Sequence, residues 1–307
     1  MKSILSFIFL ILFTTSVVSQ VSKTVELSAP GTLSSILTST EKATITNLTL
    51  RGNIDARDIK CLRDEVIELT VLDISSTTIK SYSGTLGTNP SVVSYPANEL
   101  PQYSFCTPTA IPKNKLTDVV LPNSITSIGN HAFYSCEGLL SAVIPNSVVS
   151  IGDYAFQFCK SLKSITLGTG LQSIGAQCIY KSGIKVIHSL SNVPPSLGAL
   201  ALGQNYISIV YVPTASVSAY KSANGWSELP VAINQLVSIN NTTAGTLAAN
   251  IASSGYQLYS ISKLKISGWM NSADFDLIKN NMPLIMELDL SEVSVTGNAL
   301  PKNAQYR

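Results

Sequence analysis

The chain has 307 residues, of which 45% are hydrophobic and only 12% are charged, and its 20 basic and 18 acidic side chains leave a formal net charge of +2. This apolar content excludes a wholly disordered chain, and the near balance of charge argues against a nucleic-acid binder, which would show a basic stripe. Two histidines exclude a histidine-rich metal site.

The first 19 residues predict a secretory signal peptide. Lys2 gives a basic start, residues 4–12 form an apolar run, and small residues up to Ser19 precede Gln20. The run is too short for a bilayer-spanning helix, which takes about 20 residues. We therefore expect an exported protein without a membrane span, beginning at Gln20, with 307 − 19 = 288 residues and a net charge of +1.

A pattern of Leu/Ile-x-x-apolar-x-apolar hexads runs along the chain, and each hexad predicts one short strand. Most successive hexads are separated by nearly equal intervals, within the range of about 20–29 residues that leucine-rich repeats take per turn. We expect an α/β leucine-rich-repeat solenoid, in which short parallel strands stack into a sheet and short helices and turns connect them. The hexads begin at Ile45, Leu69, Leu116, Leu139, Leu162, Ile184, Ile207, Ile261 and Ile285.

Residues 20–110 predict an N-terminal leucine-rich-repeat-like module with two hexads joined by a helix. Asp55 is placed to cap that helix, and Ile59, Leu62 and Val66 lie on one of its faces.

Residues 111–232 predict an array of repeats and its closing element. Three stretches, which start at Leu121, Ile144 and Leu167, align without gaps and so share one period. We expect their shared glycines, among them Gly152 and Gly175, to adopt a backbone conformation that residues with a Cβ atom avoid. We also expect Phe133 and Phe156 to stack in a core column. Residues 210–229 predict a last strand, a short helix around 217–223 and an end that contains Trp226.

Residues 233–307 predict a second copy of the N-terminal module. Residues 45–79 align with 261–295 without gaps, seven of the 35 positions are identical, and Asn271 takes the capping place of Asp55. Because the first copy continues into repeats where the second reaches Arg307, we expect the second copy to be truncated and the chain to be a fragment.

These residues resemble a known family. IPNSVVSIGDYAFQFCKSLKSITL, from Ile144, is similar to the BspA-type leucine-rich repeat, whose consensus contains Leu-Pro, Ile-Gly, Ala-Phe and Cys at these spacings. The third repeat departs from it, with Cys178-Ile179 in place of Ala-Phe. The resemblance implies an exported or surface-displayed bacterial protein that mediates adhesion or binds host or extracellular macromolecules, with a protein or glycan as ligand.

No catalytic motif accompanies the repeats, and we expect neither an enzyme nor a cofactor or metal. His131 occupies a variable position and is expected to be a surface side chain. His188 lies on a strand face without an obvious acid or nucleophile beside it. Cys136 and Cys159 occupy equivalent positions one turn apart, where parallel side chains do not converge, so the five cysteines are expected to be buried free thiols.

Two alternatives stay open. The first is a structural spacer or stalk for a missing C-terminal domain. The second is a secreted glycan-acting enzyme, which needs paired carboxylates on one face; the strand-face acids Asp73, Asp118, Glu287 and Asp289 are expected to be scattered over separate arrays.

A candidate ligand-binding surface follows from the hexad. Positions one, four and six are expected to face the core, so positions three and five face outward on the sheet. Many of these outward side chains are apolar, which is typical of an interaction site, and Tyr211 and His188 are the expected anchors. The candidate residues are Val120, Val143, Thr166, Val186, His188, Ile209 and Tyr211.

Overall fold

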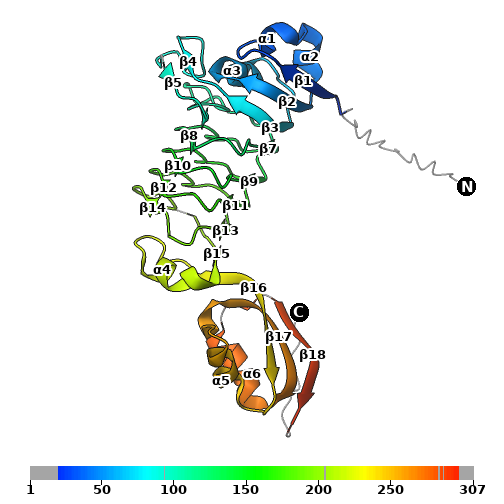
Figure 1. Cartoon of the computed structure of the whole chain (residues 1–307), viewed down its shortest axis with the longest axis vertical. Helices are drawn as coiled ribbons and strands as arrows, with labels where there is room; N and C mark the ends of the chain where they lie inside the picture. The colour runs from blue at the N-terminus through cyan, green and yellow to red at the C-terminus, as the bar shows by residue number, and fades with distance from the viewer. Residues whose placement is uncertain (1–19, 93, 204, 283, 286, 297–307) are drawn as a thin grey trace, which may run out of the picture.

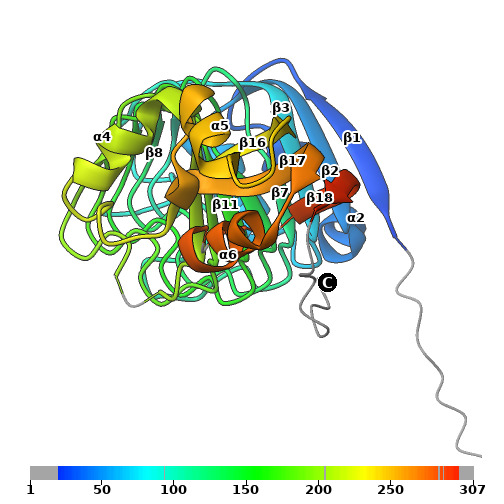
Figure 2. The same ribbon diagram turned by 90° about the horizontal axis from the view of Figure 1, so that it is seen from below.

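The computed structural model describes residues 20–296 apart from residues 93, 204, 283 and 286, so the predicted signal peptide lies outside the described residues. The chain forms an elongated stack (Figure 1), with the N-terminal module at the top, the repeats in the middle and the second copy of the module at the bottom. Viewed along the stack, successive turns of the repeats lie one behind another (Figure 2).

Parallel strands form one side of the stack. A four-stranded sheet has the order β1-β2-β3-β7 and a seven-stranded sheet the order β18-β17-β16-β15-β13-β11-β9. The two sheets meet where Leu140 N donates to Thr117 O at 3.0 Å. The strands are β1 (Ser22–Leu27), β2 (Asn47–Ile54), β3 (Val71–Ile79), β7 (Asp118–Val120), β9 (Ser141–Val143), β11 (Ser164–Leu167), β13 (Val186–Ser189), β15 (Ile209–Val212), β16 (Val231–Asn241), β17 (Ile261–Met270) and β18 (Glu287–Val295).

A second parallel sheet, in the order β14-β12-β10-β8-β6, is built from two-residue strands. A short antiparallel pair, β4 (Tyr82–Ser83) with β5 (Ser94–Tyr95), follows β3 within the N-terminal module. The strands of the second sheet are β6 (Glu99–Leu100), β8 (Ser127–Ile128), β10 (Ser150–Ile151), β12 (Ser173–Ile174) and β14 (Ser196–Leu197).

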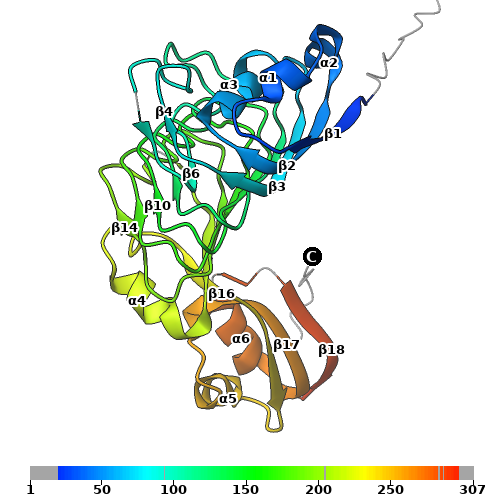
Figure 3. The same cartoon turned by 45° about the horizontal axis from the view of Figure 1, so that its top comes forward.

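Short helices connect the strands, and α5 and α6 lie on one side of the sheet formed by β16 to β18 (Figures 1 and 3). The α-helices are α1 (Leu33–Ile36), α2 (Ser39–Thr44), α3 (Ala56–Asp64), α4 (Val217–Ser222), α5 (Leu247–Ser253) and α6 (Ser272–Asn281), with 3-10 turns η1 (Thr214–Ser216) and η2 (Leu258–Ser260).

The hexad pattern predicts the inward side chains correctly. In the hexad that contains β11, for example, Leu162, Ile165 and Leu167 at positions one, four and six are all buried. The pattern missed β1 and β16. The register of β1 with β2 places the polar residue Gln20 at the first hexad position, and in β16 a register shift between Ile233 and Leu236 breaks the hexad spacing.

The predicted aromatic column is confirmed and is longer than expected. The Phe133 and Phe156 rings stack with centroids 4.9 Å apart, and Phe105 adds a third ring 5.0 Å from Phe133. All five cysteines are buried free thiols, as predicted. Cys159 Sγ donates to the Phe133 carbonyl at 3.0 Å, so the thiol satisfies a polar backbone atom beside the column.

The predicted reason for the repeat glycines is wrong. The positive φ angles lie two residues further on, at Tyr154 (59°) and Gln177 (49°), and not at Gly152 or Gly175. A Cβ on Gly152 would lie 2.7 Å from the Asn130 backbone nitrogen of the preceding turn. Glycine is therefore required because neighbouring turns approach closely.

Both copies of the module are built around one buried carboxylate. The predicted caps are confirmed, since Asp55 and Asn271 each form a capping box at the start of α3 and α6. In the first copy Asp58 accepts backbone N–H bonds from Gly31, Leu33 and Asp55. Asp274 accepts the same three bonds in the second copy, from Gly245, Leu247 and Asn271.

The closing element is also as predicted. After β15, η1 and α4 lead to Trp226, which is fully buried and donates its Nε1–H to the Pro195 carbonyl at 2.8 Å. This cap covers the last repeat before β16 extends the sheet into the second copy of the module.

Candidate binding face of the solenoid

The candidate face consists of hexad positions three and five on β7, β9, β11, β13 and β15, and the parallel register aligns these positions in two rows. At position three, Ser141, Ser164, Val186 and Ile209 are cross-strand partners in succession. At position five the partners are Val143, Thr166, His188 and Tyr211. The ladder thus brings together side chains that lie one full repeat apart in the sequence.

The apolar side chains are exposed at the β7–β9 end of the face. Val120 is 49% exposed and Val143 is 62% exposed. Farther along, Thr166, Val186 and His188 are half-buried. Neighbouring exposed valines on the water-facing side of a sheet are typical of contact sites.

At the β15 end, the expected exposure is wrong. Ile209 is 3% exposed and Tyr211 is 8% exposed. Both form a small second hydrophobic cluster with Ala232 of β16, against which Val186 and Leu284 pack. The second copy of the module covers this end, because β16 continues the ladder beside β15. Tyr211 therefore packs against β16. Its predicted role as an anchor rested on exposure to solvent, which it does not have.

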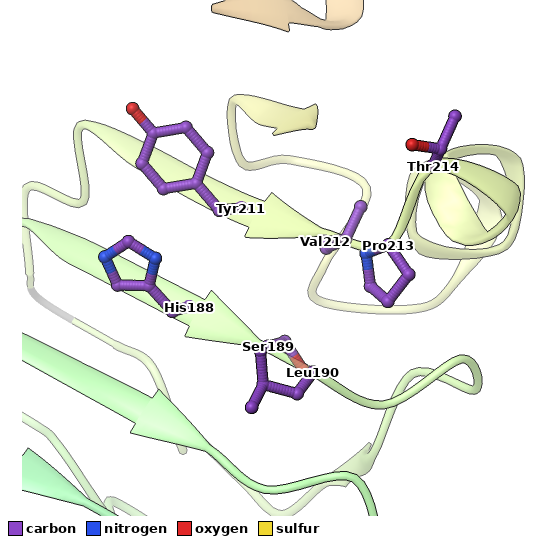
Figure 4. Close-up of a pocket in the computed structure, with 7 residues that line it drawn as sticks. All are labelled: His188, Ser189, Leu190, Tyr211, Val212, Pro213 and Thr214. Atoms are coloured by element: carbon purple, nitrogen blue, oxygen red, sulfur yellow. The ribbon is translucent and has the colours of Figure 1, made fainter. Parts of the chain in front are cut away.

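A hollow of about 330 Å³ opens where β13 and β15 end (Figure 4). The rings of His188 and Tyr211 stack with centroids 5.0 Å apart and an interplanar angle of 19°. The hollow's lining is completed by residues from the strand ends and from the turn into η1, which are Ser189, Leu190, Val212, Pro213 and Thr214.

Within this lining, Ser189 fills the hexad position that elsewhere holds an apolar residue. Its buried hydroxyl lies 2.6 Å from the Tyr220 hydroxyl of α4. Tyr220 in turn donates to the Ser191 carbonyl at 3.2 Å. The exception in the hexad is explained by this hydrogen bond, which ties the closing helix to the last repeats.

The electrostatics of the hollow favour a neutral imidazole. Burial, with a smaller contribution from the positive charge of Lys263, lowers the pKa of His188. Neutral histidine offers one donor and one acceptor to a ligand. Across the described part of the chain, no group of three or more His, Cys, Asp or Glu side chains is arranged to hold a metal ion.

The strand-face acids are less scattered than expected. Asp73 and Asp118 lie diagonally on the neighbouring strands β3 and β7. Each holds a local hydrogen bond: Ser75 N donates to Asp73 at 2.9 Å and Thr117 Oγ1 donates to Asp118 at 2.8 Å. On β18, Glu287 and Asp289 pair with lysines of β17. These carboxylates are thus engaged within the sheet.

His131 is not the surface side chain that its variable position suggested. It is half-buried between Tyr103 and Tyr154, whose ring centroids lie 4.8 and 4.7 Å away. Burial lowers its pKa. The backbone is left-handed at all three positions and directs their side chains into one row. Because the residue type differs from repeat to repeat at this position, the sequence pattern does not reveal that row.

Comparison with protein families identifies the repeats. Residues 97–199 match the model described as BspA type Leucine rich repeat region, in six copies. The chain carries a BspA-type leucine-rich repeat region. The match confirms both the resemblance and the leucine-rich-repeat fold class. The comparison with curated proteins gives no match.

The BspA-type region spans β6 to β14 and so contains the exposed half of the candidate face. The family comparison identifies this repeat region and no catalytic domain. The domain boundaries at 110/111 and 232/233 stay predictions. Within the described range, no helix has the length and apolar character needed to cross a membrane.

Proposed function

We propose that this protein is exported and non-catalytic, and that it mediates adhesion by binding an extracellular protein or glycan through the outward face of its BspA-type repeats. The observation that carries the proposal is the pair of exposed valines, Val120 and Val143, on neighbouring strands. They lie on a solvent-exposed sheet face, where polar side chains are the usual choice. BspA-type repeats occur typically in surface proteins that bind other proteins, which supports the same conclusion.

The rigidity of the face favours binding. Each turn is held to the next by parallel ladders on two sides and by the aromatic column between them. A surface that is already ordered loses little conformational entropy when a ligand docks. On the same sheet face, the hollow at His188 adds polar groups that a ligand could contact in addition to the two valines.

The test is a double substitution, Val120→Asp with Val143→Asp, in the secreted chain. Purified extracellular-matrix proteins and a glycan array serve as probes, and surface plasmon resonance measures affinity for those that bind. We expect at least about a tenfold loss of affinity, since a charge in an apolar contact opposes desolvation. Val193→Asp is the matched control, because Val193 is 72% exposed but lies in the turn after β13.

Unchanged affinity in the double variant, with an unchanged melting temperature, would overturn the assignment to this face. Equal loss in the Val193→Asp control would do the same. Export is tested separately: mass spectrometry of secreted material should find Gln20 at the N-terminus, and an intact Met1 would contradict the predicted signal peptide.

The structural spacer is the second candidate function. The seven-stranded ladder from β9 to β18 joins the repeats to the second module without a flexible connection, which favours a stiff rod. A spacer role predicts that no probe binds the outward face and that the two substitutions change nothing.

A further inference from the structure

Another hollow, of about 270 Å³, lies beside the row of Tyr103, His131 and Tyr154. These three residues follow β6, β8 and β10 of the second sheet, which lies on the opposite side of the stack from β9 and β11 (Figure 1). The hollow is therefore separate from the valine face of the repeats. The remaining residues that line it are Cys106, Thr107, Pro108, Ala110, Tyr134 and Gln157.

The lining combines aromatic and apolar walls with hydroxyl and amide groups. Its one ionisable side chain that titrates near neutral pH is His131. Burial lowers the pKa of His131, with Asp153 opposing this effect, so the neutral imidazole is favoured. Such a lining offers apolar contact and hydrogen bonds to a ligand, and it has no charge with which to pair an ion.

The imidazole of His131 is held in place by ring stacking. Its Nδ1 atom is buried and has no hydrogen-bond partner among the described residues. A buried polar atom without a partner costs free energy, and native structures usually supply one. A half-turn about the Cβ–Cγ bond keeps the ring in its plane between Tyr103 and Tyr154 and exchanges the positions of Nδ1 and Cδ2. Either edge of the ring can thus be turned toward a molecule in the hollow without disturbing the stack.

Tyr134 and Gln157 add further polar groups. Gln157 is buried, and its Nε2 donates to Gln177 Oε1 at 2.9 Å, which leaves its own Oε1 as an acceptor. Tyr134 is half-buried, and its phenol can both donate and accept. Together with His131, these side chains supply donors and acceptors on one hollow that is otherwise aromatic and apolar.

The loop that contains Thr107 forms an ordered wall of the hollow. Ala110 N donates to the Thr107 carbonyl at 2.8 Å, which closes the loop on itself. Below it, the buried Arg63 donates to the Tyr103 carbonyl at 2.7 Å and pairs with Asp64, so its charge is neutralised within the fold. A wall that is already ordered loses little conformational freedom when a ligand binds.

We propose that this hollow binds one neutral sugar unit of a glycan. The C–H groups of a pyranose ring pack against the tyrosine walls, and its hydroxyls hydrogen-bond with His131, Tyr134 and Gln157. The volume lies just below the range of about 300–1,000 Å³ for small-molecule sites, which suits a single sugar unit. An anionic sugar is disfavoured, because no cation lines the hollow and the Asp153 carboxylate lies close enough to act on His131.

NMR of isotope-labelled histidine tests the proposal, because the chain has only two histidines. The chain from Gln20 to Arg307 is titrated with the methyl glycosides of glucose, galactose, mannose and N-acetylglucosamine, up to about 50 mM each. We expect the His131 imidazole signals to shift and saturate with at least one glycoside, with a dissociation constant of about 1–10 mM. The His188→Gln variant assigns the two sets of signals, and His188 is the internal reference for the opposite side of the stack.

A pair of matched variants locates the sugar. Tyr134→Ala should weaken binding at least about tenfold, because it removes a wall and a hydroxyl from the hollow. Tyr180→Ala is the control and should leave binding unchanged. Tyr180 occupies the equivalent position of a later repeat, is also half-buried and also meets the Phe158 ring edge-on, but it does not line the hollow.

Tyr134→Phe keeps the ring and tests the hydroxyl alone. We expect it to weaken binding about threefold to tenfold, the usual loss for one hydrogen bond. Melting temperatures show whether each variant stays folded, and this conservative variant keeps the test valid if Tyr134→Ala unfolds the repeats.

Three results would overturn the proposal. The first is the absence of a saturable His131 shift with every glycoside. The second is equal binding by Tyr134→Ala and Tyr180→Ala, which would place the sugar elsewhere. The third is tighter binding of methyl glucuronide than of methyl glucoside, which would exclude a site for neutral sugars. The valine substitutions on the other sheet leave this hollow unaltered, so the two proposals fail separately.

Discussion

The two copies of the module are nearly alike inside and differ at their last strand. Each has a capping box, a buried aspartate that accepts three backbone N–H bonds, and a register shift at the same place in the ladder. In the first copy the following repeat turn buries the core face of β3, whereas the matching side chains of β18 stay partly exposed. The module's backbone is thus specified locally, while the burial of its edge depends on its neighbour.

This difference bears on stability along the stack. In a solenoid each unit is stabilised by its own contacts and by those with adjacent units. The repeats have neighbours on both sides, whereas within the described residues the second module meets the rest of the chain at one end, through the β15–β16 pairing and contacts such as that of Lys221 with the Tyr259 ring. We therefore expect the second module to open before the repeats do.

The largest expected effect concerns the aromatic column. Phe156→Ala should lower the free energy of unfolding by about 3–5 kcal/mol, because Phe156 is buried and its ring stacks on Phe133. Phe275→Ala in α6 should destabilise the second module while leaving the repeats folded.

Urea denaturation can follow the two regions through their tryptophans, since Trp226 is buried at the end of the repeats and Trp269 lies on β17. Single-tryptophan variants separate the two signals. Coincident transitions for both tryptophans in every variant would show that the two regions unfold as one unit and would break the comparison.

The buried aspartates should have the next largest effect. Asp274→Ala leaves three N–H groups without their acceptor, at a cost of about 3 kcal/mol. The Trp269 transition should shift and the Trp226 transition should not. Asp58→Ala should cost a similar amount, measured by circular dichroism, and a negligible cost in either copy would contradict the shared construction.

Hydrogen exchange should sharpen the contrast between the two edges. Amides of β3 that bond within the sheet should exchange at least about 100-fold more slowly than their equivalents in β18, because opening β3 also requires displacing β7. Mass spectrometry of peptic fragments covering 71–79 and 287–295 makes this comparison. Similar rates would mean that coverage of the edge has no energetic consequence.

The smallest expected effect is a loss of stability at alkaline pH that is confined to the first two-thirds of the chain. All five cysteines precede residue 179. Burial raises the pKa of Cys106 to about 11 and the pKa values of Cys61 and Cys178 to about 12. Below pH 9 these thiols are protonated in both states; between pH 9 and about 11–12 only the unfolded chain loses the protons, so stability falls as pH rises.

Lys113 opposes this trend, because burial lowers its pKa to about 8 and the unfolded chain binds the extra proton between pH 8 and 10.5. Denaturation at pH 8.5 and 10.5, with Cys178→Ala as the control, measures the net slope. We expect the Trp226 transition to move and the thiols to have no effect on the Trp269 transition. A slope unchanged by Cys178→Ala would count against the thiols as its cause.

Much of the fold could be predicted from residues close together in the sequence. The hexads located nine strands and their inward side chains, and Asp55 and Asn271 marked the starts of two helices. The Phe133–Phe156 column followed from the regular period of the repeats. These features depend on local patterns of side-chain size and polarity that each turn repeats.

Local sequence patterns therefore establish the repeating unit and which of its side chains face inward. Which outward side chains meet solvent depends on tertiary contacts: Val143 is exposed and Tyr211 is buried, although both occupy position five of a hexad. Exposure depends on what lies across the strand edge, and for Tyr211 that neighbour is Ala232, which belongs to a strand the hexad pattern missed. The close approach of turns at Gly152 and the row formed by Tyr103, His131 and Tyr154 likewise arise between turns, because stacking brings together residues that no local pattern connects.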